Sequence, residues 1–86
     1  MINKLRNEIE LIDSEILKLI SRRITAVKKL KIEKVNSGLL VKDNLREKIL
    51  LIRWRKKGKQ AKLRNGYVIK LFRLVISESR RIQNEK

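Results

Sequence analysis

The side chains of this sequence that could do chemistry are cations at positions where a helix should be apolar. Apolar residues recur at helical spacing from the N-terminus: Ile2, Leu5, Ile9, Ile12, Ile16 and Leu19. Continuing that stripe in steps of three or four residues gives Arg23, Val27, Leu30 and Lys34. Two cations therefore fall on a face that the pattern assigns to the core, where a charge is costly unless it is paired.

Two later segments repeat this mixture of polar and apolar residues on one helical face. The last segment carries it at steps of four, three and four: Phe72, Ile76, Ser79 and Gln83. The middle segment carries it where it begins, with Asp43, Glu47, Leu50 and Trp54 on one face and Arg46 beside them. Each polar residue alone has a structural explanation, such as a helix cap or a snorkelling arginine. Together they favour a buried pocket with several cations and few carboxylates, which suits an anionic ligand.

A long helix should carry the first set of residues. It is expected to run from about residue 2 to about residue 35 and to stop at Asn36-Ser37-Gly38. Such a helix is about 50 Å long at 1.5 Å per residue, whereas a compact globule of this chain length has a radius of gyration of about 12 Å. Its apolar stripe therefore needs a second chain, and the simplest arrangement is a two-fold homodimer.

Two shorter helices should carry the other sets. The second helix is expected to begin at Asp43 as its N-cap, to continue to about Lys57 and to end at Gly58. A third helix should follow a loop and span about residues 67–84, with Asn65 as a candidate cap. The chain has no proline, three glycines and no sustained strand-like alternation, so residues 1–86 should form a single all-α domain.

The composition narrows the chemistry. The chain has no cysteine and no histidine, so the usual zinc and iron ligands and the commonest acid–base side chain are missing. We therefore expect no metal and no cofactor. The N-terminus has no apolar segment typical of a signal peptide, and the longest aliphatic run covers only residues 49–52, so we expect a cytoplasmic protein without a membrane span.

The net charge favours anionic partners. Lysine and arginine outnumber aspartate and glutamate by 24 to 9, and seven cations lie in residues 53–64. We interpret this run as a solvated helix end and loop. One Trp, one Tyr and one Phe give little surface on which nucleobases could stack, so nucleic acid is expected only as a non-specifically bound polyanion.

The order and spacing of the polar residues resemble those of the all-helical, or type II, chorismate mutases over nearly the whole chain. The matching pieces are Leu5-Arg6 with Ile9 and Ile12-Asp13, Arg23 and Lys34 eleven residues apart, Asp43-x-x-Arg46-Glu47, and Ser79-x-x-x-Gln83. The resemblance implies an intertwined homodimer of three-helix chains. It also implies an isomerase that rearranges chorismate to prephenate, on the route to phenylalanine and tyrosine.

The resemblance also implies roles for the cationic residues. Arg23 and Arg6 of the partner subunit would bind the two carboxylates of the substrate. Lys34 and Gln83 would donate hydrogen bonds to the ether oxygen. This rearrangement is unimolecular and moves no proton, so it needs neither histidine nor metal. It gains from a fixed reactive conformer and from positive charge near the breaking C–O bond.

The remaining roles implied by the resemblance concern the ring hydroxyl and the order of the pocket. Glu47 and the backbone of Asp43 would hold the hydroxyl, while Ser79 and Arg46 would support carboxylate binding. The catalytic residues implied in this way are Arg23, Lys34, Glu47 and Gln83.

Two other functions remain open at this point. An isochorismate pyruvate lyase of the same fold would use a similar cationic pocket, although Asp43, Glu47 and Ser79 favour the mutase. A basic helical nucleic-acid-binding protein without catalysis would explain the charge, but not why Arg23 and Lys34 face inward.

Overall fold

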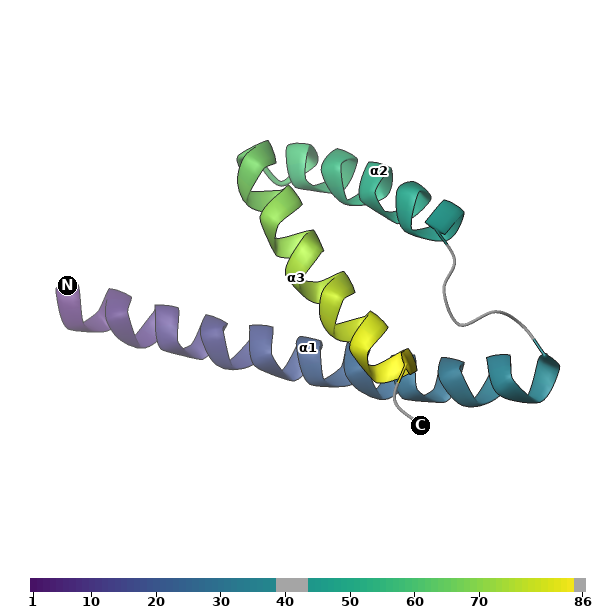
Figure 1. The fold of residues 1–86 in the computed structure, drawn as a ribbon. Helices are drawn as coiled ribbons and strands as arrows, with labels where there is room; N and C mark the ends of the chain where they lie inside the picture. The colour runs from purple at the N-terminus through teal and green to yellow at the C-terminus, as the bar shows by residue number, and fades with distance from the viewer. Residues whose placement is uncertain (39–43, 85–86) are drawn as a thin grey trace.

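The computed structural model describes residues 1–38 and 44–84. In chain order these residues form α1 (Ile2–Ser37), α2 (Asn44–Gln60) and α3 (Asn65–Asn84). Helices α2 and α3 form a hairpin above the later part of α1, and α3 packs against both of the other helices (Figure 1). The predicted all-α class and the three helices are thus confirmed, and the described residues contain no strand.

Helix α1 determines the shape of the chain. The molecule measures 55 × 23 × 16 Å and has a radius of gyration of 15.9 Å, well above the value of about 12 Å for a compact globule of this length. Gly38 ends α1 in the left-handed conformation (φ 71°, ψ 17°), and its N–H donates to the carbonyl oxygens of Lys34 and Val35. The predicted stop signal is confirmed, and α1 extends two residues beyond the predicted Val35.

The predicted end of α2 is wrong. Gly58 lies inside α2, which continues to Gln60, and it is buried where α3 passes. A Cβ atom built on Gly58 would lie 2.6 Å from Cγ2 of Val68. This glycine therefore allows close packing of α2 and α3, and it does not end the helix.

The turn between α2 and α3 is shorter than predicted, because α3 begins at Asn65. Lys62 adopts a left-handed conformation (φ 61°) in this turn, and the N–H of Leu63 donates to the carbonyl of Gly58 at 2.9 Å. Asn65, the candidate cap, is the first residue of α3. Its side-chain oxygen accepts a hydrogen bond from Nε of Arg55 at 3.2 Å.

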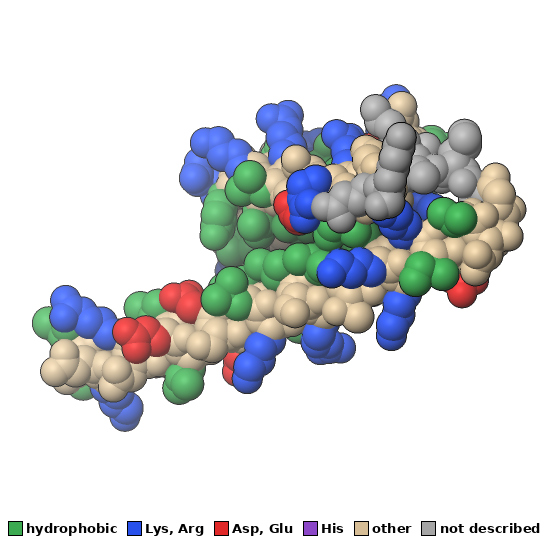
Figure 2. Space-filling model, turned by 60° about the horizontal axis from the view of Figure 1, so that its bottom comes forward, with side chains coloured by type: hydrophobic (Ala, Val, Ile, Leu, Met, Phe, Trp, Pro, Cys, Tyr) green, Lys and Arg blue, Asp and Glu red, His purple; other side chains and the backbone are tan. Residues whose placement is uncertain are grey.

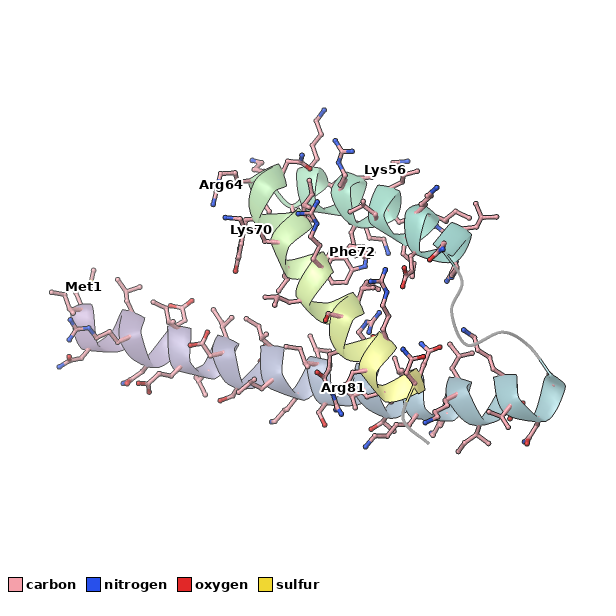
Figure 3. The ribbon with its side chains drawn as sticks, viewed as in Figure 1. Met1, Lys56, Arg64, Lys70, Phe72 and Arg81 are labelled. Atoms are coloured by element: carbon pink, nitrogen blue, oxygen red, sulfur yellow. The ribbon has the colours of Figure 1, made fainter. Side chains whose placement is uncertain are left out.

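The core is small and lies mainly on α3. Its buried apolar side chains are Val27, Val68, Phe72, Ile76 and Ile82. Trp54 of α2 meets Phe72 edge-on, with 5.3 Å between ring centroids and an angle of 71° between the rings, and Figure 3 shows Phe72 between α2 and α3. Among the described residues, no helix combines the length and apolar content that a membrane crossing requires.

The two parts of α1 differ in burial. Every residue from 1 to 22 is exposed, whereas buried and half-buried residues occur from Arg23 onward. We call residues 2–22 the projecting segment and residues 23–37 the packed segment. Ile9 and Ile16 of the projecting segment are 56% and 48% exposed, and Figure 2 shows hydrophobic side chains along its visible face. Within this chain, the apolar stripe of the projecting segment is uncovered.

Candidate functional site

All three helices contribute side chains to a cavity of about 250 Å³. It lies where the later part of α3 passes between α1 and the beginning of α2. Its lining residues are Arg23, Val27, Leu30, Arg46, Glu47, Leu50, Ile76, Ser79, Arg80, Gln83 and Asn84. The three mixed polar and apolar faces found in the sequence thus meet around one space.

Arg23 is held in this cavity by α3. Its Nη1 donates a hydrogen bond to Oγ of Ser79, and the Ser79 hydroxyl donates in turn to the carbonyl of Val75 at 3.0 Å. Ser79 is only 7% exposed, so its hydroxyl has a fixed orientation. Burial lowers the pKa of the Arg23 guanidinium below its ordinary value, although arginine stays protonated at neutral pH. A partly desolvated cation attracts an anionic ligand more strongly than an exposed one.

Lys34 and Gln83 connect the next turns of α1 with the end of α3. Nζ of Lys34 donates to Oε1 of Gln83 at 3.2 Å, and both residues are half-buried. Since the Gln83 oxygen accepts this bond, its amide nitrogen is the group that can donate to a ligand. Nearby, Nζ of Lys31 donates to the carbonyl of Ile82 at 3.0 Å and further fixes α3 on the packed segment.

Glu47 forms a forked ion pair with Arg80, a residue that the sequence analysis missed. Nε of Arg80 donates to Oε1 of Glu47 at 2.6 Å, and Nη2 donates to Oε2. The signal for Arg80 was present in the sequence: it follows Ile76 by four residues and precedes Gln83 by three, so it shares their helical face. The steps of four, three and four through Ser79 pass over Arg80, although the two residues are adjacent on α3.

Three predicted site residues are not part of the described cavity lining. Lys34 lies next to it, bonded to the lining residue Gln83. Arg6 precedes Arg23 by 17 residues on α1, which places it about 25 Å away along the helix axis. It therefore cannot reach the cavity of its own chain. Asp43 lies outside the described residues.

The charges around the cavity favour an anionic ligand. Arg23, Arg46 and Arg80 line it together with the carboxylate of Glu47, and Lys34 is bonded to the lining residue Gln83. Within residues 1–38 and 44–84, acidic side chains do not gather in a group of three or more that could hold a metal ion. The described site can therefore bind carboxylates and donate hydrogen bonds to a ligand oxygen.

Comparison with known proteins identifies the family. The family model for chorismate mutase type II matches residues 5–84. Two bifunctional chorismate mutase/prephenate dehydratases are similar, one from Buchnera aphidicola subsp. Schizaphis graminum (strain Sg) and one from Buchnera aphidicola subsp. Acyrthosiphon pisum (strain APS). Each is 36% identical over 74 residues, which cover 86% of this chain and 19% of the relative.

The chain thus spans about a fifth of the length of these curated relatives. The match confirms the resemblance read from Arg23, Lys34, Ser79 and Gln83, and the family it names is one of isomerases, the predicted class of enzyme. This chain belongs to the type II chorismate mutase family.

Proposed function

We propose that this chain rearranges chorismate to prephenate in the cavity between its three helices, as part of a two-fold homodimer. One observation carries the proposal: Arg23 of α1 and Gln83 of α3 line the same cavity, Lys34 of α1 donates a hydrogen bond to Gln83, and all three side chains are partly buried. Family membership supports the same activity. Residues 1–86 would act as a single domain.

The reaction needs electrostatic help at one atom. In the rearrangement the ether C–O bond breaks as a C–C bond forms, and negative charge develops on the oxygen. Lys34 and the Gln83 amide would donate to that oxygen, and the bond between them fixes both donors before the substrate arrives. Preorganised donors stabilise the transition state because they need no reorientation during the reaction.

The two carboxylates of the substrate require a second cation beside Arg23. We assign this role to Arg6 of the partner subunit, because Arg6 lies about 25 Å from its own cavity. A cavity of about 250 Å³ is smaller than most ligand pockets, which measure about 300–1,000 Å³. A partner helix lying across the opening would enclose the substrate, and its apolar stripe would become buried in the dimer.

The remaining residues would orient the substrate. Glu47 and the backbone of Asp43 would accept or donate hydrogen bonds at the ring hydroxyl. Arg46 lines the cavity near Glu47, and Ser79 acts by holding Arg23. The presence of Glu47 and Ser79 in the cavity supports a mutase over an isochorismate pyruvate lyase.

The outer cations have a lesser role in this proposal. Lys56, Arg64 and Lys70 lie on the outside of the α2–α3 hairpin (Figure 3), where they would bind polyanions such as nucleic acid without sequence preference. Arg23 and Lys34 instead bond inside the site, which argues against nucleic-acid binding as the main function. The cytoplasmic location stays a prediction.

Chorismate turnover tests the proposal directly. Loss of chorismate absorbance, with prephenate identified as the product, should occur with the parent chain. Parallel assays with isochorismate should yield no pyruvate. If the chain released pyruvate from isochorismate and did not convert chorismate, its activity would be that of the lyase and not of the mutase.

Lys34→Ala should reduce kcat substantially. The loss of one preorganised donor is expected to raise the activation free energy by about 3–4 kcal/mol. Lys28→Ala is the matched control, because Lys28 is exposed on the same helix and should keep parental activity. Equal rates for the two variants would remove Lys34 from the mechanism.

A further inference from the structure

Arg80 has a special position on the α2–α3 hairpin. The two helices are closest near their turn, where Gly58 meets Val68, and they diverge away from it (Figure 1). Glu47 lies in the first turn of α2, at the open end of the hairpin. The ion pair with Arg80 therefore joins α2 to α3 at the end where they diverge, and both residues line the cavity.

The geometry of the pair restricts the Glu47 carboxylate. Each oxygen accepts one guanidinium N–H, from Nε or from Nη2 of Arg80, and such a fork fixes the plane of the carboxylate as well as its position. The side chain of Glu47 is 19% exposed, and that of Arg80 is 49% exposed. The acid is thus the partner that lies deeper in the site.

Glu47 is held by this fork at the lining of the cavity. An ionised carboxylate has about four lone-pair directions, and the fork uses one on each oxygen. The hydrogen bond to Glu47 raises the pKa of the Arg80 guanidinium.

We propose that Arg80 is a positioning residue that places the Glu47 carboxylate for the ring hydroxyl of the substrate. This role rests on the proposed mutase activity and goes beyond the residues that the family resemblance supplies. Arg80 acts through Glu47 and does not touch the substrate. It also sets the distance between α2 and α3 at the opening of the cavity.

Three variants test this role. Arg80→Ala should lower kcat/KM about 10- to 100-fold, because the hydrogen bond between the ring hydroxyl and the Glu47 carboxylate is weakened. That bond forms in the substrate complex as well as in the transition state, so the loss should appear mainly as a higher KM. Arg80→Lys should recover only part of the loss, since lysine keeps the charge but lacks the fork. Arg81→Ala is the matched control: Arg81 pairs with Glu78 on the surface of the same helix, and kcat/KM should stay within about twofold of the parent.

A double-mutant cycle separates positioning from direct substrate contact. If Arg80 acts only through Glu47, adding Arg80→Ala to Glu47→Gln should change kcat/KM by less than about threefold. A full further loss in the double variant would mean that Arg80 binds the substrate itself and would overturn the proposal. Parental kcat/KM in folded, dimeric Arg80→Ala would overturn it as well.

The parent chain separates failure of this role from failure of the proposed function. A parent chain without any chorismate turnover would overturn both. An active parent with an unaffected Arg80→Ala variant would remove the positioning role alone.

Discussion

The two segments of α1 share one apolar spacing and have opposite surroundings. In the packed segment, Arg23 and Val27 line the cavity, and Lys34 donates a hydrogen bond to Gln83 of α3. In the projecting segment, the stripe continues without a break, but every side chain is exposed. A regular helical stripe therefore shows which face of α1 is apolar, but it does not show whether the rest of the same chain covers that face.

The difference also indicates what the projecting segment is for. The stripe has six exposed apolar side chains at helical spacing, and burial of each would contribute roughly 1–2 kcal/mol of stabilisation. This burial would favour association with a second copy of the chain. The same segment carries Arg6, which its own cavity lacks. In the proposed dimer, association and completion of the site would both depend on the same 21 residues of α1, residues 2–22.

Charges placed in the stripe should have the largest effect. Ile9→Asp combined with Ile16→Asp would put four carboxylates into the interface of a dimer, where unpaired charges are very costly. We expect loss of the dimer in sedimentation velocity and a fall in activity of about 10³-fold or more. Asn7→Asp with Ser14→Asp adds the same charges on the opposite face of α1 and should leave both properties unchanged. A dimeric, active stripe variant would show that the projecting segment does not form the interface.

Pairing two inactive variants tests whether the projecting segment serves the partner's cavity. Arg6→Ala and Arg23→Ala homodimers should each lose about 10²- to 10³-fold in kcat/KM, since each removes one partner of a charge pair with the substrate. Refolding the two together should restore about a quarter of the sites, because half of the dimers are then mixed and each mixed dimer has one intact site. No recovery after verified chain exchange would place Arg6 outside the site.

Gln83→Glu tests the contact between the packed segment and the end of α3. A carboxyl group donates a hydrogen bond only while it is protonated, and its ionised form would put negative charge beside the oxygen that gains electrons. Activity of the variant should be highest at acid pH and fall about tenfold or more as the group ionises, while the parent stays much flatter. Lys34 favours ionisation of the new carboxyl and burial opposes it. The prediction is therefore that activity falls as pH rises, without a stated midpoint. Parallel pH–rate profiles of folded, dimeric variant and parent would remove Gln83 from the mechanism.

The smallest effect is expected at Gly58, which lies outside both segments. Alanine should gain about 1 kcal/mol in helix propensity, but its Cβ would meet the stiff side chain of Val68 at 2.6 Å. The clash should prevail and lower the free energy of unfolding by about 1–2 kcal/mol, measured by urea denaturation. Gly66→Ala is the control, because its Cβ would meet only Nη1 of Arg64 at 3.6 Å. Equal or greater stability of Gly58→Ala would contradict the close packing of α2 and α3.

Sequence patterns predicted the fold better than the details of its packing. Helical period and the Gly38 stop were sufficient for α1, because both are local properties of the chain. Gly58 was misinterpreted because a glycine can end a helix or allow another helix to approach closely, and only the position of Val68 distinguishes the two. That contact depends on how α2 and α3 pack, which the local pattern does not contain.

The candidate site shows the same division. Arg23, Ser79 and Gln83 could be selected from spacing alone, and they do line one cavity. Arg80 was missed because two continuations of the α3 face are equally regular, through Ser79 and through Arg80. Its importance depends on Glu47, which is 33 residues away in sequence. The roles of these residues stay predictions until the variants are measured.

The continuity of α1 means that its length should matter as much as its composition. Each residue inserted into a helix turns everything beyond it by about 100° and advances it by about 1.5 Å. One residue inserted between the projecting and packed segments would leave every side chain unchanged within its own segment, yet the apolar stripe and Arg23 would no longer face the same way. Both sites of the proposed dimer would be misaligned at once, because each α1 contributes to both. The number of residues between Arg6 and Arg23 is therefore as much a part of the proposed site as the two arginines themselves.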